Sequence, residues 1–358
     1  QPGFTFQRFA NWLVLFFVLV FKLGIVEFCV NPLLRQQACM ISGLHDATFM
    51  HDQDDIGLGH GVMSGTVHHF VRRADVMFGI GTSFTRHGMT TPIPSGKVII
   101  HSTNDPIDID KSYTVDHAIL GDAKAVLRQF IEACRDLLNG KLRPTEVPVA
   151  EEIASVRDEW LREWMPKLTS NETPITPYRV MWEFIQGIDP ADAIVTHDSG
   201  SPRDQLMPFY QATIPRSYLG WGKSHGLGTG LGLAIGAKLA SPDKMCVNFM
   251  GDAAFGMVGL DFETAVRSNL PIITVVLNNS TMAIYSDSRF PYSVEKYNVK
   301  GLSGQFSEVA QALGAFAEKV SDPNDITPAI RRGLEVTQNG RPAVLEFITR
   351  EEGEYSKF

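Results

Sequence analysis

Apolar runs bounded by turns dominate the C-terminal half of the chain. Residues 244–250 and 270–277 are continuous runs rich in β-branched and other apolar side chains, which is typical of strands buried on both faces of a parallel sheet. Residues 255–268, between these runs, carry the apolar spacing of a helix. Strand, helix and strand in this order predict a βαβ unit, whose two strands end at the same edge of the sheet.

The same patterns divide the whole chain into an α/β fold with two Rossmann-like, doubly wound parallel-sheet domains. We expect a central α/β domain over residues 45–140, a proline-bearing linker and amphipathic helix over 141–172, and a second domain over 173–358. Thr176 and Pro177 form a helix-start signal in the second domain. The other elements expected are strands at 75–81, 97–101, 194–197 and 343–348, and helices at 122–139, 306–313 and 326–336.

Residues 1–44 do not fit this organisation. The run WLVLFFVLVF over residues 12–21 is short for a membrane span and has neither a basic flank nor a small-residue cleavage site. We favour an apolar leader that is foreign to the fold. A membrane segment over residues 12–30 and a genuine strand and helix of the core are the alternatives.

Composition narrows the class of protein without naming its chemistry. The chain has 358 residues, 44% of them apolar and 20% charged, and a formal net charge of −8. These values describe a globular protein and disfavour nucleic-acid binding, for which a basic patch is expected. Its four cysteines lack CxxC spacing, which favours a reduced, intracellular protein of the cytoplasm. The histidines, His60, His68 and His69 among them, form no tight Cys/His cluster, so zinc is not expected.

Polar residues follow both strands of the predicted βαβ unit. Gly251 and Asp252 end the first run, and Asn278 and Asn279 end the second. One carboxylate and one amide oxygen held side by side suit Mg²⁺ that also binds phosphate oxygens. Small residues at the first turn leave room for an anion near the backbone amides. The alternative is an ordinary unit in which Asp252 caps a helix and the asparagines form a turn.

The segment from Gly251 to Tyr285 (GDAAFGMVGLDFETAVRSNLPIITVVLNNSTMAIY) resembles the thiamine diphosphate fingerprint of the acetolactate synthase-like branch of thiamine diphosphate enzymes. This resemblance implies Mg²⁺ bound by the side chains of Asp252 and Asn279 and by the backbone carbonyl of Thr281. The diphosphate oxygens would accept hydrogen bonds from backbone amides in two turns. Those of Ala253 and Ala254 follow Gly251 and Asp252, at positions where many relatives have Gly or Ser. Those of Met282 and Ala283 follow Asn279.

A glycine-dense stretch upstream matches the same family. In WGKSHGLGTGLGLAIGAKLA (residues 221–240), Gly228, Gly232 and Gly236 recur every four residues, which predicts a helix face that something packs against closely. By resemblance Leu227 would bend the cofactor, the carbonyl of His225 would accept a hydrogen bond from its amino group, and Gly226 would lie beside it. The alternative is a small-residue helix that packs on a sheet or a subunit.

The segment IVTHDSGSPRDQ (residues 194–205) reads as a strand that ends in a polar turn. By resemblance Ser199, Gly200 and Ser201 would hold the far end of the diphosphate, with Asp198 fitting the same pattern. Synthases usually carry a Gln-His pair where this chain has Ser201 and Pro202, which puts the substrate and the branch in doubt. A simple strand-to-loop turn is the alternative.

The resemblance implies decarboxylation or carboligation of 2-oxo acids, with a decarboxylase of 2-oxo acids or of an oxalyl-CoA type as the runner-up. The family's catalytic glutamate lies on an N-terminal pyrimidine-binding domain, for which we expect no room here, so we nominate no catalytic residue. The chain is therefore expected to be an enzyme segment in a homo-oligomer, a dimer or tetramer, or beside a chain that supplies the absent domain. A non-catalytic cofactor-binding remnant or partner subunit is the alternative. FAD, with Arg86 as its contact, is a weaker implication and is not expected.

Overall fold

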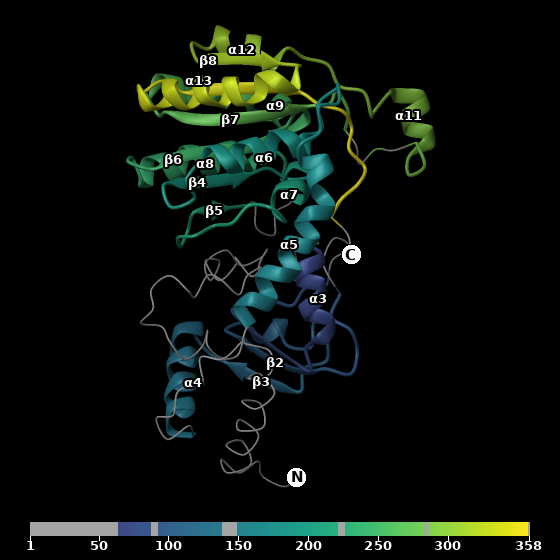
Figure 1. Cartoon of the computed structure of the whole chain (residues 1–358), viewed down its shortest axis with the longest axis vertical. Helices are drawn as coiled ribbons and strands as arrows, with labels where there is room; N and C mark the ends of the chain where they lie inside the picture. The colour runs from purple at the N-terminus through teal and green to yellow at the C-terminus, as the bar shows by residue number, and fades with distance from the viewer. Residues whose placement is uncertain are drawn as a thin grey trace. The chain divides into compact units, whose positions relative to one another are not determined.

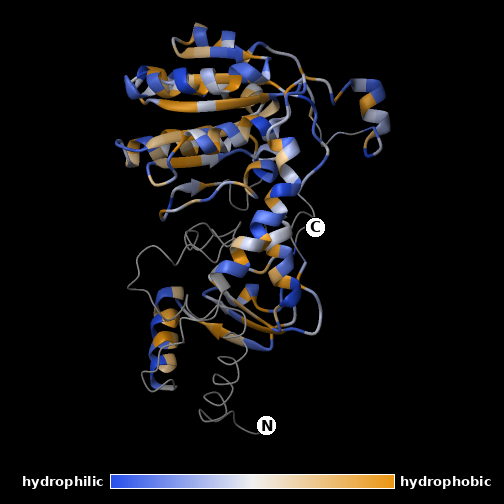
Figure 2. Ribbon diagram, viewed as in Figure 1, coloured by the Kyte–Doolittle hydropathy of each residue, from blue (hydrophilic) through white to orange (hydrophobic). Residues whose placement is uncertain are grey.

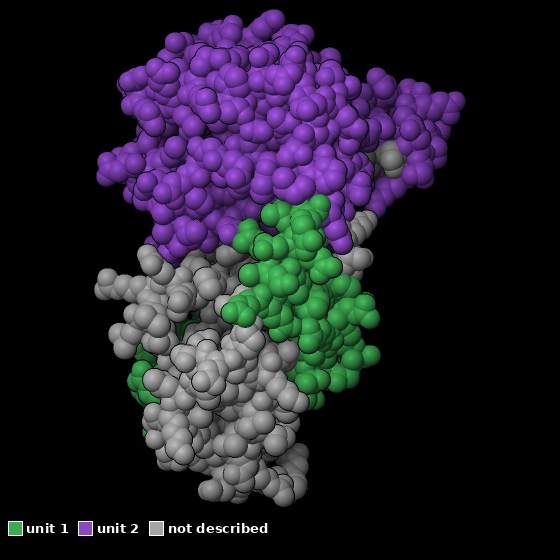
Figure 3. All heavy atoms as spheres, viewed as in Figure 1, with its two compact units in different colours: residues 1–162, 357–358 green, residues 163–356 purple. Residues whose placement is uncertain are grey.

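The computed structural model describes residues 64–86, 92–137, 149–220, 226–282, 285 and 287–356 (Figure 1). It divides into two compact units, residues 1–162 with 357–358 and residues 163–356 (Figure 3). The predicted leader over residues 1–44, with its alternative membrane segment, lies outside the described residues. Within the described residues no helix is both long enough and apolar enough to cross a membrane.

The first unit contains a three-stranded parallel sheet in the order β1-β2-β3. The strands and the helix predicted between residues 75 and 139 are confirmed within the described residues, but β3 was missed because its four residues are at most half buried. The elements of this unit are α3 (Gly65–Arg73), β1 (Val76–Ile80), β2 (Val98–Thr103), η3 (Pro106–Asp108), β3 (His117–Leu120) and α4 (Ala123–Leu137). The long helix α5 (Val149–Leu168) continues from this unit into the second.

The second unit is built on a six-stranded parallel sheet in the order β5-β4-β6-β7-β9-β8. The apolar runs of β6 and β7 are its middle strands, as Figure 2 shows by their hydrophobic colouring. The strands are β4 (Ala193–His197), β5 (Tyr218–Leu219), β6 (Met245–Gly251), β7 (Ile272–Asn278), β8 (Phe316–Val320) and β9 (Ala343–Ile348). The helices are α6 (Pro177–Gly187), α7 (Ser201–Leu206), α8 (Thr229–Ala240), α9 (Asp252–Val258), η5 (Gly259–Asp261), α10 (Phe262–Arg267), α11 (Pro291–Tyr297), α12 (Phe306–Ala312), η6 (Pro323–Asp325) and α13 (Ile326–Gln338).

Helices cover both faces of this sheet. Side chains of α8, α9, α10 and α12 join β6, β7 and β9 in one apolar cluster, which includes Phe255, Val276 and Val344. On the opposite face Phe184 of α6 packs its ring edge-on against Phe249 and Phe347, with centroids 5.4 and 6.4 Å away. The parallel-sheet α/β class predicted from the sequence is therefore confirmed.

Two expectations about helices were wrong in detail. The helix expected over residues 255–268 begins at Asp252 and is interrupted by η5, where a Cβ at Gly259 would lie 2.5 Å from the ring of Phe255. Of the three glycines predicted to lie on a closely packed face, Gly228 has a close neighbour, because a Cβ there would lie 2.4 Å from Val258 Cγ1. A Cβ at Gly232 or Gly236 would meet nothing within 4 Å among the described residues, whereas Gly230, which was not predicted, is also closely packed.

Candidate cofactor and metal site

Parallel register brings three polar loops together at the carboxyl edge of the second sheet. His197 pairs with Phe249 on the neighbouring strand, and Gly251 pairs with Leu277 on the next strand. The segments that follow these strands begin at Asp198, at Asp252, which is the first residue of α9, and at Asn279. The strand order thus places the three segments chosen from the sequence side by side.

Asp198 has no exposed surface, and its carboxylate accepts hydrogen bonds from three backbone N–H groups, one of which is shared between its two oxygens. Oδ1 accepts from Ser199 N at 2.8 Å and from Gly228 N at 2.9 Å, and Oδ2 accepts from Gly228 N at 3.1 Å and Gly230 N at 3.0 Å. Burial raises the pKa of Asp198, although these N–H groups oppose the rise. Because it accepts hydrogen bonds from amides at the start of α8, Asp198 caps this helix.

Ser199, Gly200 and Ser201 continue from this capping residue. Gly200 has φ +89°, a conformation that favours glycine, and it is the N-cap position of α7. The Ser201 hydroxyl lies 2.9 Å from the Tyr355 hydroxyl, so a residue near the end of the chain holds this loop. The sequence carried no signal for this pairing, because 154 residues separate the two positions.

The loop before α8 is held closely against its neighbours. Gly228 has φ +92°, and a Cβ there would lie 2.4 Å from Val258 Cγ1. Leu227 is half buried and packs against the apolar cluster, while the Gly226 carbonyl accepts a hydrogen bond from Thr229 Oγ1 at 2.8 Å. His225, the third residue that the resemblance implies in this loop, lies outside the described residues.

Asp252 differs from Asp198 in how its carboxylate is satisfied. Oδ1 accepts from Ala253 N at 2.8 Å, whereas Oδ2 is buried and has no hydrogen-bond partner among the described residues. The side chain is 3% exposed, and burial raises its pKa. The backbone N–H groups of Ala253 and residues 279–281 oppose this rise, so the loop after β7 faces the carboxylate.

Asn279 begins a tight turn in that loop. Its Oδ1 accepts from Thr281 N at 2.9 Å and from Thr281 Oγ1 at 3.0 Å. Ser280, between them, has φ +56° in the left-handed region. An amide oxygen has two acceptor positions, so a metal bound by Asn279 would take the place of the weaker hydroxyl bond.

The donor set fits a divalent cation that shares its coordination with a phosphate group. The unpartnered oxygen of Asp252 is a buried hard ligand, and the amide oxygen of Asn279 and the carbonyl of Thr281 belong to the turn beside it. Among the described residues no three His, Cys, Asp or Glu side chains are grouped to hold a metal, so Mg²⁺ here would depend on these mixed oxygens.

The backbone amides implied for the diphosphate differ in whether they already donate a hydrogen bond within the protein. Ala253 N donates to Asp252, and Met282 N donates to the carbonyl of Lys300 at 2.8 Å. Ala254 lies in the first turn of α9, where helix N–H groups have no upstream carbonyl to bind. Ala283 lies outside the described residues.

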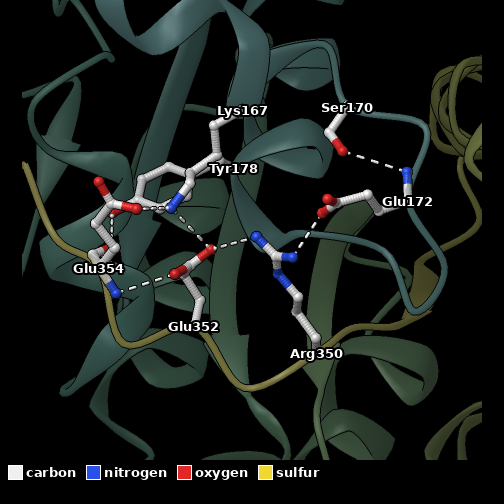
Figure 4. A network of polar contacts seen from close by, with 7 residues as sticks. All are labelled: Lys167, Ser170, Glu172, Tyr178, Arg350, Glu352 and Glu354. Atoms are coloured by element: carbon white, nitrogen blue, oxygen red, sulfur yellow. Dashed lines mark hydrogen bonds and ion pairs between the residues drawn. The ribbon is translucent and has the colours of Figure 1, made fainter.

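The C-terminal segment, residues 349–356, is held close to the same edge by a polar network (Figure 4). Glu352 Oε2 accepts from Arg350 at 3.0 Å and lies 3.3 Å from Lys167 Nζ, while Oε1 accepts from Glu354 N at 2.9 Å. The Tyr178 hydroxyl donates to the Glu354 carbonyl at 2.8 Å. These contacts hold the segment that leads to Tyr355, whose hydroxyl meets that of Ser201 at the start of α7.

Two models of one enzyme family match this chain. Residues 198–347 match the C-terminal thiamine pyrophosphate-binding domain of thiamine pyrophosphate enzymes, and residues 37–130 match the central domain of the same enzymes. The first match contains all three loops described above.

Curated relatives agree with these matches. The chain is 27% identical to a probable acetolactate synthase large subunit of Methanococcus aeolicus over 304 residues, which are 82% of this chain and 50% of the relative. It is 27% identical over 328 residues to the acetolactate synthase isozyme 3 large subunit of Escherichia coli, covering 87% and 54%. Sulfoacetaldehyde acetyltransferase of Alcaligenes xylosoxydans xylosoxydans is 26% identical over 317 residues, covering 79% and 51%. The chain thus spans about half the length of these relatives.

Proposed function

Because the chain belongs to the thiamine diphosphate enzyme family, with its central and C-terminal domains, we propose that it binds thiamine diphosphate through Mg²⁺ at the carboxyl edge of the second sheet. In this proposal Asp252, Asn279 and the Thr281 carbonyl hold the ion. The diphosphate is faced by Ser199, Gly200, Ser201 and the Ala254 amide.

The observation that carries this proposal is the buried, unpartnered Oδ2 of Asp252. A buried carboxylate oxygen without a partner costs free energy unless a ligand compensates it. The N–H groups of residues 279–281 reduce this cost without making a hydrogen bond to Oδ2. A divalent cation would compensate it fully and would bridge the carboxylate to a phosphate anion.

The reaction proposed is decarboxylation of a 2-oxo acid followed by carboligation, as in acetolactate synthases. The bound thiazolium would supply the electron sink for this chemistry. The chain's own residues would bind and orient the diphosphate, and Leu227 would support the bent cofactor. Because the chain spans about half of its relatives, we propose this activity for a homo-oligomer or for an assembly with a chain that supplies a pyrimidine-binding domain.

A decarboxylase of 2-oxo acids or of an oxalyl-CoA type is a second candidate, because this chain departs from the usual synthase pattern at Ser201. The synthases usually carry a Gln-His pair at this turn, whereas here a serine hydroxyl is paired with Tyr355. One matching relative is named as an acetyltransferase and not as an acetolactate synthase, so the relatives that match this chain carry names of more than one reaction. Pyruvate consumption with and without acetolactate formation separates the two candidates.

Calorimetric titration of the purified chain with thiamine diphosphate, with and without Mg²⁺, tests the proposed site. We expect Mg²⁺-dependent binding that Asp252→Ala reduces at least about 100-fold, because the ion loses its charged ligand. Asp261→Ala, which removes an exposed aspartate in η5, is the matched control and should leave binding unchanged. Equal affinity of Asp252→Ala and the native chain, or no binding by the native chain, contradicts the assignment.

A further inference from the structure

Glu346 is a carboxylate placed within the apolar layer of the second unit. It lies on β9 with no exposed surface, pairs in register with Val276 on β7, and follows Val344 of the apolar cluster by two residues. Its Oε1 accepts from Asn278 Nδ2 at 2.7 Å, and its Oε2 accepts from Ser307 N at 2.8 Å. A carboxylate in such a layer is costly, so the groups that its two hydrogen bonds hold indicate what it contributes beyond packing.

The bond to Asn278 determines which way that amide faces. A carboxylate only accepts hydrogen bonds, so Asn278 must turn its Nδ2 toward Glu346. Its Oδ1 then faces the following loop, where it accepts from Ser280 N at 3.0 Å and from Ser280 Oγ at 3.3 Å. Asn278 is 5% exposed, so water has little access to replace either bond.

The held residue, Ser280, is the one on which the turn depends. Its φ of +56° is a conformation that serine adopts at a cost, and the Asn278 oxygen stabilises it. Asn279 and Thr281 lie on either side of this residue, and the backbone of residues 279–281 faces Asp252. A series of buried hydrogen bonds therefore runs from β9, through Asn278, to the loop that carries the proposed metal ligands.

We propose that Glu346 is a positioning residue for the Mg²⁺ site, and that it acts by fixing the orientation of the Asn278 amide. This inference rests on the proposed function, because it assigns a task to Glu346 only if the loop binds a metal. The alternative role is purely structural: through Ser307, Glu346 satisfies an N–H group at the start of α12.

Glu346→Gln separates the two roles. The carbonyl oxygen of the introduced side chain can still accept from Ser307 N, which preserves the first turn of α12. Its NH₂ group then faces Asn278, which must turn its own oxygen inward and present NH₂ to the N–H of Ser280. Two donors then face each other, so the turn loses its anchor while the helix start does not.

A second substitution can restore the pairing of donors and acceptors that Glu346→Gln disturbs. In the double variant Glu346→Gln with Asn278→Asp, one oxygen of the new carboxylate accepts from the new amide, and the other accepts from Ser280. Total charge and shape stay the same, and each donor again meets an acceptor.

Two further variants show whether a change in metal binding could result from a general loss of folding. Asn278→Ala removes the anchor of Ser280 without touching the bond from Ser307 to Glu346, so it tests the same step should Glu346→Gln fail to fold. Val344→Ala is the control for general loss of packing on the same strand.

The test is a titration of the purified chain with Mn²⁺ at saturating thiamine diphosphate, with free Mn²⁺ followed by electron paramagnetic resonance. We expect Glu346→Gln and Asn278→Ala to weaken Mn²⁺ binding about 10-fold or more, because the turn that carries two of the proposed ligands loses the bond that holds Ser280. The double variant should recover most of the affinity of the native chain, and Val344→Ala should keep it, with every variant assayed below its melting temperature.

Other outcomes overturn the inference. Unchanged binding by Glu346→Gln, no recovery in the double variant, or an equal loss in Val344→Ala would assign Glu346 to the fold alone. If the native chain and Asp252→Ala bind Mn²⁺ equally, the proposed function fails and the inference fails with it. If Asp252→Ala abolishes binding while Glu346→Gln does not alter it, the inference alone is wrong.

Discussion

Asp198 and Asp252 are both aspartates that follow parallel strands of one sheet, and both are almost completely buried. Burial raises the pKa of each carboxyl. They differ in their partners: Asp198 accepts from Ser199, Gly228 and Gly230, whereas Asp252 has one oxygen that no hydrogen bond from the described residues satisfies. The comparison shows that two equally buried carboxylates can differ in how many of their acceptor positions hydrogen bonds occupy. The unoccupied oxygen of Asp252 is the basis on which we propose this residue, and not Asp198, as the metal ligand.

The largest expected effect is a difference in stability between asparagine variants of these two aspartates, measured without cofactor. Asp198→Asn puts an NH₂ group against the amides that begin α8, which should lower the free energy of unfolding by about 3 kcal/mol. Asp252→Asn keeps the bond from Ala253 and removes a buried charge that is only partly compensated, but it places an NH₂ group near the N–H groups of residues 279–281, so stability should change by less than about 1 kcal/mol. Urea denaturation of both variants measures this contrast, and equal destabilisation would remove the distinction between them.

A smaller effect on stability should distinguish two glycines of α8, Gly230 and Gly232, when each is replaced by alanine. A Cβ at Gly230 would lie 2.5 Å from Asn248 Oδ1, so Gly230→Ala should destabilise the fold by about 1–3 kcal/mol. Gly232→Ala, with nothing within 4 Å among the described residues, should stabilise the helix by about 1 kcal/mol. Thermal unfolding of the apo chain measures both changes. If Gly232→Ala destabilised it as much, that face would be packed, as the glycine spacing alone suggested.

The smallest effect concerns a third buried acid, Glu352, which is satisfied by charge as well as by N–H groups. Burial would raise its pKa, but the Glu354 N–H, Arg350 and Lys167 together lower it. A lowered pKa in the folded state stabilises the fold above the pKa of the unfolded chain. This contribution is lost as the pH falls through the folded-state pKa.

Glu352→Gln should therefore cost about 1 kcal/mol at pH 7 and progressively less as the pH falls below about 4. Urea denaturation between about pH 3 and pH 7 checks this, with Glu295→Gln, at an exposed glutamate of α11, as the control. A difference between Glu352→Gln and the native chain that stays constant with pH would show that the ion pairs contribute nothing.

Local pattern was sufficient for much of this molecule. Continuous apolar runs predicted β6, β7 and β9, and helical spacing predicted α4, α12 and α13, because burial on both faces or on one stripe leaves a period in the sequence. The order of strand, helix and strand then implied that Asp252 and Asn279 end at one edge. Short elements with half-buried patterns, such as β3 and β8, left too weak a period to be predicted.

By itself, then, the sequence determined the parallel-sheet class and the strand ends at which polar residues gather, since both depend on neighbours along the chain. Only the tertiary structure decided that Asp198 caps the helix after Gly228, that Ser201 pairs with Tyr355, and that Glu346 supports Asn278. The two members of these pairs are 30, 154 and 68 residues apart along the chain. Hydrogen bonds between residues so far apart leave no period in a single sequence, because folding alone brings their donors and acceptors together.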